Sequence, residues 1–205
     1  MKIGKLKTNP AKSFWQVANS SEGFTLVELL VSVVIISIIT GVLLGNRRQF
    51  TDRLALKSQV YNVVLYLRQA QVDSLSVKAS NGNFGTSYGV YFDSNYANNT
   101  FKYFADNNSN GVYDAGESNE DVVFTTGMTM TVCANNGSNC FGGNFRKAGV
   151  TFKRPDPIAR FTFLNNGGGS SSGTVAPLLI NITSPAGTTA SVKVESSGSI
   201  SVQGL

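Results

Sequence analysis

An uninterrupted apolar run is the feature that most constrains this chain. Residues 24–44 read FTLVELLVSVVIISIITGVLL, and Glu28 is the only charged side chain among these 21 residues. At 1.5 Å per residue, a helix of this length extends roughly 31 Å, which is enough to cross a bilayer core. Because the run is apolar on all sides, lipid suits it better than the interior of a soluble protein. The sequence therefore predicts a membrane-spanning helix.

A cleaved secretory signal is the nearest alternative to a permanent anchor. Such signals have a shorter apolar core that is followed by a small-residue cleavage site. Here the run continues into Gly45-Asn46-Arg47-Arg48, and no Ala-x-Ala sequence follows it. The small residue is instead Gly23, directly before the run. This order favours an anchor that is kept.

Composition argues against an enzyme. The chain contains no histidine, which removes the usual general base, the Ser-His-Asp and Cys-His arrangements and histidine-ligated zinc. The formal net charge is +5, but residues 1–23 hold four of the 17 basic residues and one of the 12 acidic residues. The remaining net charge of about +2 is too small to argue for nucleic acid as a general partner.

Two cysteines, Cys133 and Cys140, flank the segment Ala-Asn-Asn-Gly-Ser-Asn. The Asn-Gly pair supports a tight reversal that could bring the two sulfur atoms together. If this part of the chain lies outside the cytoplasm, a disulfide is the expected state of the pair.

The start of the apolar run resembles a processing signal. Residues 23–31, GFTLVELLV, are similar to the class III signal of type IV prepilins and pseudopilins. The resemblance implies that a prepilin peptidase/N-methyltransferase cuts between Gly23 and Phe24 on the cytoplasmic side and N-methylates the Phe24 amine. It divides the chain into a cleaved leader (1–23), a transmembrane and polymerisation helix (24–45), an amphipathic helix (46–81) and a β-rich head (82–205).

Glu28 is the fifth residue after the predicted cut. A carboxylate costs about 2.5–3.5 kcal/mol at a bilayer centre and less near the interface. One interpretation is therefore a tolerated interfacial charge. The resemblance implies a role in assembly instead, in which Glu28 pairs with the Phe24 amine of a neighbouring subunit and sets the register of the filament.

A helical pattern continues after the span. Apolar or small residues recur at three- and four-residue steps at Leu56, Val60, Val63, Leu67, Ala70 and Ser74, and Val64 and Leu75 widen this stripe. We expect the stripe to pack on the chain's own sheet, with a partner helix as the alternative. Asn81-Gly82 is a C-terminal stop signal, so residues from Phe24 to about Ala79 could form one helix.

After Gly82 the pattern changes to short runs separated by turns. Strands are predicted at 88–93, 100–105, 121–125, 128–133, 150–152, 158–164, 178–183, 190–195 and 199–202, and a Gly/Ser-rich loop at 165–173. The expected fold is α+β and pilin-like: a long N-terminal helix, half transmembrane and half amphipathic, packed on an antiparallel β-sheet head. Through LRQAQ at 67–71 and YGVYFD at 88–93, the chain resembles the H-type minor pseudopilins and related minor pilins.

A twelve-residue segment has the spacing of a calcium loop. Oxygen-bearing positions are Asp106, Asn108, Asn110, Val112 through its carbonyl, Asp114 and Glu117, and Gly111 stands where such loops turn sharply. The segment predicts one bound Ca²⁺, and we expect no other cofactor. The flanking residues read as strands, so this is no EF-hand domain. A solvated turn without an ion is the alternative.

Basic residues gather once in the head, at Arg146, Lys147, Lys153, Arg154 and Arg160, among phenylalanines. Some minor pilins take up DNA, so Lys153 and Arg154 are candidates for DNA contact. Ordinary solvated strand faces are the alternative interpretation.

The sequence is thus interpreted as a minor pilin or pseudopilin of a type IV pilus or type II secretion system, with other pilins and the cytoplasmic membrane as partners. The processing signal and the cysteine pair favour a cytoplasmic N-terminus and a head outside. The alternatives are a filament-displayed binding module, for DNA or a surface, and a solitary anchored domain that never polymerises.

Overall fold

The computed structural model describes residues 23–45, 47–76, 78–95, 100–125, 127–134, 137, 139–142, 145–156, 158–164, 170–173 and 177–205. Within these ranges, the side chains of residues 47–49 and 170–173 are not described. Residues 1–22, most of the predicted leader, lie outside the described part. The chain divides into two compact units, Met1–Gly45 and Asn46–Leu205, each considered by itself below.

Within residues 23–45, the described part of the first unit, there is one helix, α1 (Leu26–Gly45). Thr25 is its N-cap residue, because Thr25 Oγ1 accepts the backbone N–H of Glu28 at 3.2 Å. Farther along, the hydroxyls of Ser32, Ser37 and Thr40 each donate to the carbonyl four residues earlier at 2.7 Å. These bonds satisfy the three hydroxyl donors within the helix, which suits an apolar solvent. By length and composition, α1 could cross a membrane.

The second unit begins with α2 (Arg47–Leu75). The predicted stripe is confirmed, because its six residues from Leu56 to Ser74 are at most 2% exposed. Two details of the prediction were wrong. Leu75 is 40% exposed and does not widen the stripe, and the helix ends there rather than near Ala79. The buried Ser74 hydroxyl accepts the backbone N–H of Tyr88 at 2.9 Å, which ties the end of α2 to the first strand.

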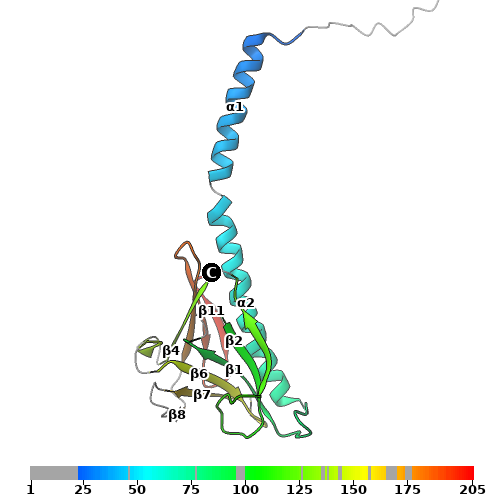
Figure 1. Cartoon of the computed structure of the whole chain (residues 1–205), viewed down its shortest axis with the longest axis vertical. Helices are drawn as coiled ribbons and strands as arrows, with labels where there is room; N and C mark the ends of the chain where they lie inside the picture. The colour runs from blue at the N-terminus through cyan, green and yellow to red at the C-terminus, as the bar shows by residue number, and fades with distance from the viewer. Residues whose placement is uncertain are drawn as a thin grey trace, which may run out of the picture. The chain divides into compact units, whose positions relative to one another are not determined.

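The strands form two antiparallel sheets (Figure 1). The first has the order β3-β2-β1-β6-β7-β8, with bounds Ser118–Val123, Thr100–Asp106, Ser87–Asp93, Lys147–Phe152, Ala159–Leu164 and Ser170–Gly173. The second has the order β11-β10-β9-β4-β5, with bounds Ile200–Gln203, Thr189–Val194, Leu178–Thr183, Thr129–Ala134 and Asn139–Cys140.

Most strands were predicted to within a few residues, but β5 and β8 were missed. Residues 170–173 were expected to be loop, yet they pair with Phe161–Leu164 of β7. Their sequence, Ser-Ser-Ser-Gly, has no apolar alternation, because an edge strand can be held by backbone pairing without contributing to the core.

The core lies between α2 and the two sheets, and α2 contacts β1 and β6 of one sheet and β9, β10 and β11 of the other. Buried aromatic residues from β1, β2 and β7 fill much of it, among them Tyr88, Phe92, Phe101 and Phe161. The predicted α+β class, with a helix packed on antiparallel strands, is confirmed, although the strands are divided between two sheets.

Candidate functional site

The predicted cleavage position is open in the structure. Phe24 is 77% exposed, and a Cβ atom added to Gly23 would meet no atom within 4 Å. Gly23 and Phe24 precede α1 and its capping residue Thr25 without belonging to the helix. A peptide bond in this setting is accessible to an enzyme without unwinding of the helix.

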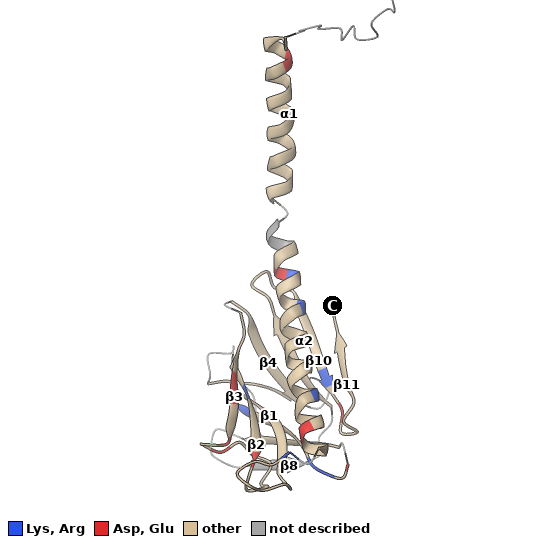
Figure 2. Ribbon diagram, turned by 90° about the vertical axis from the view of Figure 1, so that its right-hand side faces the viewer, with Lys and Arg blue, Asp and Glu red and all other residues tan. Residues whose placement is uncertain are grey.

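The surface of α1 is apolar and uncovered, since none of its residues is buried. Its large apolar side chains are between 48% and 81% exposed. Glu28 is the only ionisable residue in α1, and the ribbon beyond the first turn is free of charged residues in Figure 2. Such a surface needs lipid or other apolar helices around it, because exposure of this much apolar area to water is unfavourable.

The comparison with known families supports this interpretation. Residues 18–44 match the family described as Prokaryotic N-terminal methylation motif, and the match includes Gly23, Phe24 and Glu28. The chain is pilin-like at its N-terminus. The match implies processing by a prepilin peptidase, assembly with other pilins and a structural rather than catalytic family. No curated protein and no solved structure matches the chain.

The pilin-like N-terminus is followed by a second apolar stripe that the sequence analysis missed. This stripe lies on the exposed side of α2 and is called the outer face. It consists of Phe50, Leu54, Tyr61, Leu65, Val72 and Leu75, and each of these side chains is at least 40% exposed. Lys57 and Arg68 fall on the same stripe, which advances in steps of three and four residues. The same period that revealed the buried stripe could have revealed this one, at positions offset around the helix.

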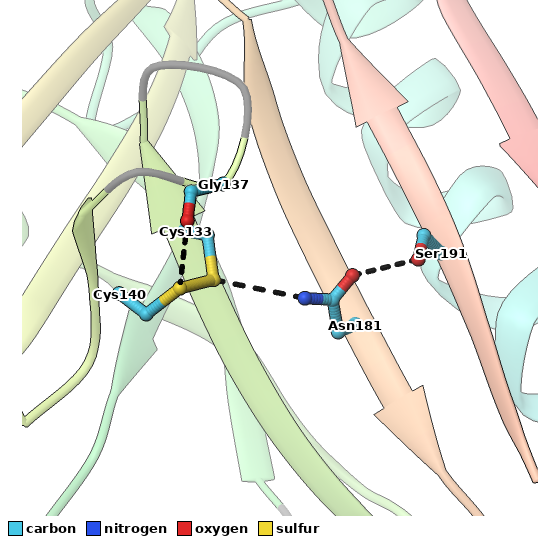
Figure 3. Close-up of a disulfide and its surroundings, with 5 residues drawn as sticks. All are labelled: Cys133, Gly137, Cys140, Asn181 and Ser191. Carbon is cyan, nitrogen blue, oxygen red and sulfur yellow. Dashed lines mark hydrogen bonds between the residues drawn. A yellow bond between two sulfur atoms is a disulfide. The ribbon is translucent and has the colours of Figure 1, made fainter.

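The predicted disulfide is confirmed. Cys133 and Cys140 are directly paired between β4 and β5, with their Cα atoms 3.9 Å apart. Asn181 of β9 donates its amide to Sγ of Cys133 at 3.6 Å and accepts a hydrogen bond from the Ser191 hydroxyl at 2.6 Å (Figure 3). The bond thus fastens the edge strand β5 to the body of the second sheet.

The loop with calcium-like spacing is closed by its own side chains. Both oxygens of Asp106 accept backbone N–H groups, from Asn110 at 3.0 Å and Gly111 at 2.9 Å. Both oxygens of Glu117 also accept backbone N–H groups, from Asn107 at 2.9 Å and Asp114 at 3.0 Å. These bonds shape the loop, and each leaves its oxygen a further lone pair.

Two more predicted ligands, Asn108 and Asn110, donate their side-chain amides to Oδ2 of a third, Asp114, each at 2.7 Å. Val112, predicted to bind through its carbonyl, donates its backbone N–H to Oδ1 of Asn110 at 2.7 Å. The oxygen-rich donor set fits calcium in its chemistry, but the two amides would have to give way. Among the described residues, no three His, Cys, Asp or Glu side chains gather as a metal site. An ion would therefore depend on amide and backbone oxygens as well, and calcium stays a prediction.

The same loop has a structural role in the first sheet. Its Tyr113 ring packs on Tyr91 and Phe104, with ring centroids 5.0 and 5.7 Å away, and Thr162 donates to the Gly111 carbonyl at 2.8 Å. The loop thereby covers the face of the sheet that points away from α2. This cover explains why every residue of β1 is buried.

The predicted basic cluster is divided in the structure. Lys147, at one end of β6, pairs with Asp93 at 3.8 Å. Lys153 and Arg154 follow the other end of β6 and line a hollow of about 560 Å³ together with Leu75, Gly85 and Pro155. The Arg154 guanidinium donates to the Phe84 carbonyl. Lys147 therefore lies at the opposite end of β6 from Lys153 and Arg154, so the predicted group is not continuous.

Proposed function

We propose that this chain is a minor pilin or pseudopilin that is cut between Gly23 and Phe24, N-methylated, and assembled through its helices into a type IV pilus or a type II secretion pseudopilus. The head would then lie outside the cytoplasmic membrane, where its disulfide is stable.

The observation that carries the proposal is the uncovered apolar surface of α1, with Glu28 in its first turn and the methylation motif over residues 18–44. The outer face of α2 adds to it, because exposed apolar residues at helical spacing suit contact with further helices. A solitary anchored domain would have no use for that second stripe.

Mass spectrometry of the mature N-terminus tests the processing step. We expect protein isolated from its native host to begin with N-methylated Phe24. A Gly23→Val variant should retain the leader, whereas Ser21→Ala, which changes a nearby leader residue, should be processed normally. Mature protein that begins at Met1 would contradict the proposal.

Co-purification with other pilins tests the assembly step. The bond that begins α1 uses the backbone N–H of Glu28, so Glu28→Gln keeps it and removes the charge. If the carboxylate pairs with an amine inside a filament, its loss costs roughly 3–5 kcal/mol, or more than a hundredfold in association. Ser32→Ala is the matched control on α1. Equal recovery of partners with Glu28→Gln would show that the Glu28 carboxylate has no role in assembly.

The hollow beside Lys153 and Arg154 favours a second candidate function, an anionic ligand such as DNA bound by the displayed head. It combines two cations with Leu75 and Pro155. The Arg154 guanidinium donates to the carbonyl of Phe84, whose side chain is 59% exposed. Binding of DNA by the full chain should weaken steeply with salt and be lost in Lys153→Ala with Arg154→Ala. Lys193→Ala, which removes a cation of the second sheet, is the control. Salt-independent binding, or none, would end this candidate.

A further inference from the structure

A basic and apolar hollow lies between the first turns of α2 and residues 204–205, with a volume of about 490 Å³. Its cations are Arg53 and Lys57, and its apolar lining includes Phe50, Leu54 and Leu205, which are 67%, 52% and 56% exposed.

Arg53 and Lys57 are the charged side chains in the lining of this hollow, beside the α-carboxylate of Leu205. No carboxylate side chain lines it, and no ion pair among the described residues involves Arg53 or Lys57. Lys57 lies over the Tyr61 ring, 6.0 Å from its centroid, which leaves the ammonium available to an anion. Asp52 is the one acidic residue of α2 before Asp73, and it does not line the hollow.

Chain connectivity keeps the hollow near the membrane. Phe50 follows Gly45, the last residue of α1, by five positions, and five residues reach at most about 17 Å. Whenever α1 spans a bilayer, Phe50 must therefore lie within about 17 Å of the end of α1, and Leu54 follows it by one helical turn. Exposed apolar side chains next to arginine and lysine are the combination that binds at the boundary of headgroups and acyl chains.

We propose that this hollow binds the phosphate of an anionic membrane lipid, with Arg53 and Lys57 as the cations and with Phe50 and Leu54 entering the acyl-chain boundary. The contact would hold the second unit against the membrane surface in the precursor, before any assembly. A free anion would lack the apolar part of the site, so the occupant is a lipid rather than soluble phosphate. The proposal requires membrane anchoring but not filament formation.

Hydrogen exchange of the full chain in nanodiscs tests this contact. Amides of residues 50–61 would be compared in discs of phosphatidylcholine alone and discs containing one-third phosphatidylglycerol. We expect exchange to slow at least fivefold in the anionic discs, since each basic residue near such a surface contributes roughly fivefold in affinity. The effect should fade at about 1 M salt.

Charge variants make the test specific. Arg53→Gln with Lys57→Gln should lose the difference between the two kinds of disc, whereas Arg68→Gln with Arg160→Gln, which removes the same charge elsewhere, should keep it. Equal exchange of the wild type in both discs would overturn the proposal. Protection by inorganic phosphate in neutral discs would also overturn it, as would protection that depends on two copies per disc rather than on lipid.

Discussion

A glycine stands in the middle of β1, where a side chain has no room. A Cβ atom on Gly89 would lie 2.5 Å from the carbonyl oxygen of Val150 and 2.8 Å from Cγ2 of Thr151. The neighbouring strand holds Gly149, where the nearest atom to an added Cβ would be 3.5 Å away. A side chain is therefore excluded sterically at Gly89 but not at Gly149.

We expect Gly89→Ala to lower the free energy of unfolding by roughly 1–3 kcal/mol, because backbone must shift to admit the methyl group. Gly149→Ala should change it by less than about 1 kcal/mol, since its surroundings allow ordinary contact. Urea denaturation of both variants measures the difference. If the two variants were equally stable, the backbones of β1 and β6 would be able to move apart without a loss of free energy.

Two hydrogen bonds between a tyrosine and a carboxylate connect α2 to the first sheet. The Tyr66 hydroxyl donates to Glu120 at 2.6 Å, and this bond, with burial, raises the pKa of Tyr66 to about 12. The Tyr103 hydroxyl donates to Asp73, and burial first and this bond second raise the pKa of Tyr103 still further. Both hydroxyls are therefore held neutral well above the pKa of a free tyrosine.

These shifts predict a loss of stability at high pH. A raised folded-state pKa gives stability that is complete below the unfolded pKa of about 10 and is lost as pH rises toward 12 and beyond. We expect urea midpoints to fall over this range, and to fall less in Tyr66→Phe with Tyr103→Phe. Tyr61→Phe, at an exposed position, should follow the wild type. If the double variant also follows the wild type, the loss of stability does not come from ionisation of Tyr66 and Tyr103.

At the scale of elements, α2 presents two apolar stripes with different surroundings. Leu67 is fully buried against the sheets, whereas Leu65, two positions earlier, is 61% exposed on the outer face. Both are leucines in the same helix, so helix propensity is the same and only the surroundings differ.

We expect Leu67→Ala to lower the free energy of unfolding by roughly 2–5 kcal/mol, because it leaves a cavity in the core. Leu65→Ala should change it by less than about 0.5 kcal/mol but should weaken co-purification with other pilins. Thermal denaturation and co-purification separate the two effects. An unchanged level of partner recovery with Leu65→Ala would remove the outer face from the assembly surface.

The loop from Asp106 to Glu117 has a buried carboxyl group at each end. Asp106 is 2% exposed, and burial raises the pKa of its carboxyl, so the ionised form is disfavoured in the folded state. Its contribution to stability is therefore complete below the unfolded pKa of about 3.9 and is lost as pH rises. At neutral pH a bound cation would offset this loss.

We expect 10 mM Ca²⁺ at pH 7 to stabilise the protein by about 1.4 kcal/mol if its Kd is near 1 mM, or roughly 3–6 °C in Tm. Asp106→Asn should abolish the response to calcium, and Asp156→Asn, at an exposed site outside the loop, should retain it. A wild-type Tm that calcium does not change would leave the loop as a cover for the sheet and nothing more.

At the scale of the whole molecule, the two units have opposite relations to solvent. None of the residues of α1 is buried, whereas the described hydrophobic core begins at Leu56 and ends at Val194. The core is thus contained in the second unit, Asn46–Leu205.

We therefore expect a fragment of residues 46–205 to fold without α1 and to be a soluble monomer with its disulfide formed. Its near-ultraviolet circular dichroism should match that of the full chain in detergent, and sedimentation should give one copy. A fragment that aggregates or lacks tertiary signals would show that α1 contributes to the fold of the second unit.

The sequence alone determined the features that depend on local composition and period. Length and uniform apolarity specify the span, and three- and four-residue steps specify the buried stripe from Leu56 to Ser74. The Asn-Gly pair between Cys133 and Cys140 was enough to predict that the two cysteines pair. Most strands of the core could be predicted for the same reason, since alternation reflects burial on one face.

Tertiary structure decided what depends on residues distant in the chain. The edge strand Ser170–Gly173 exists because β7 offers unpaired backbone groups, the helix ends at Leu75 where Ser74 meets Tyr88, and Tyr113 turns a polar loop into a cover for β1. The hollow at Arg53 and Lys57 likewise needs residues 204–205 to complete it. Such contacts leave no periodic trace, because each joins segments whose separation along the chain carries no information about their distance in space.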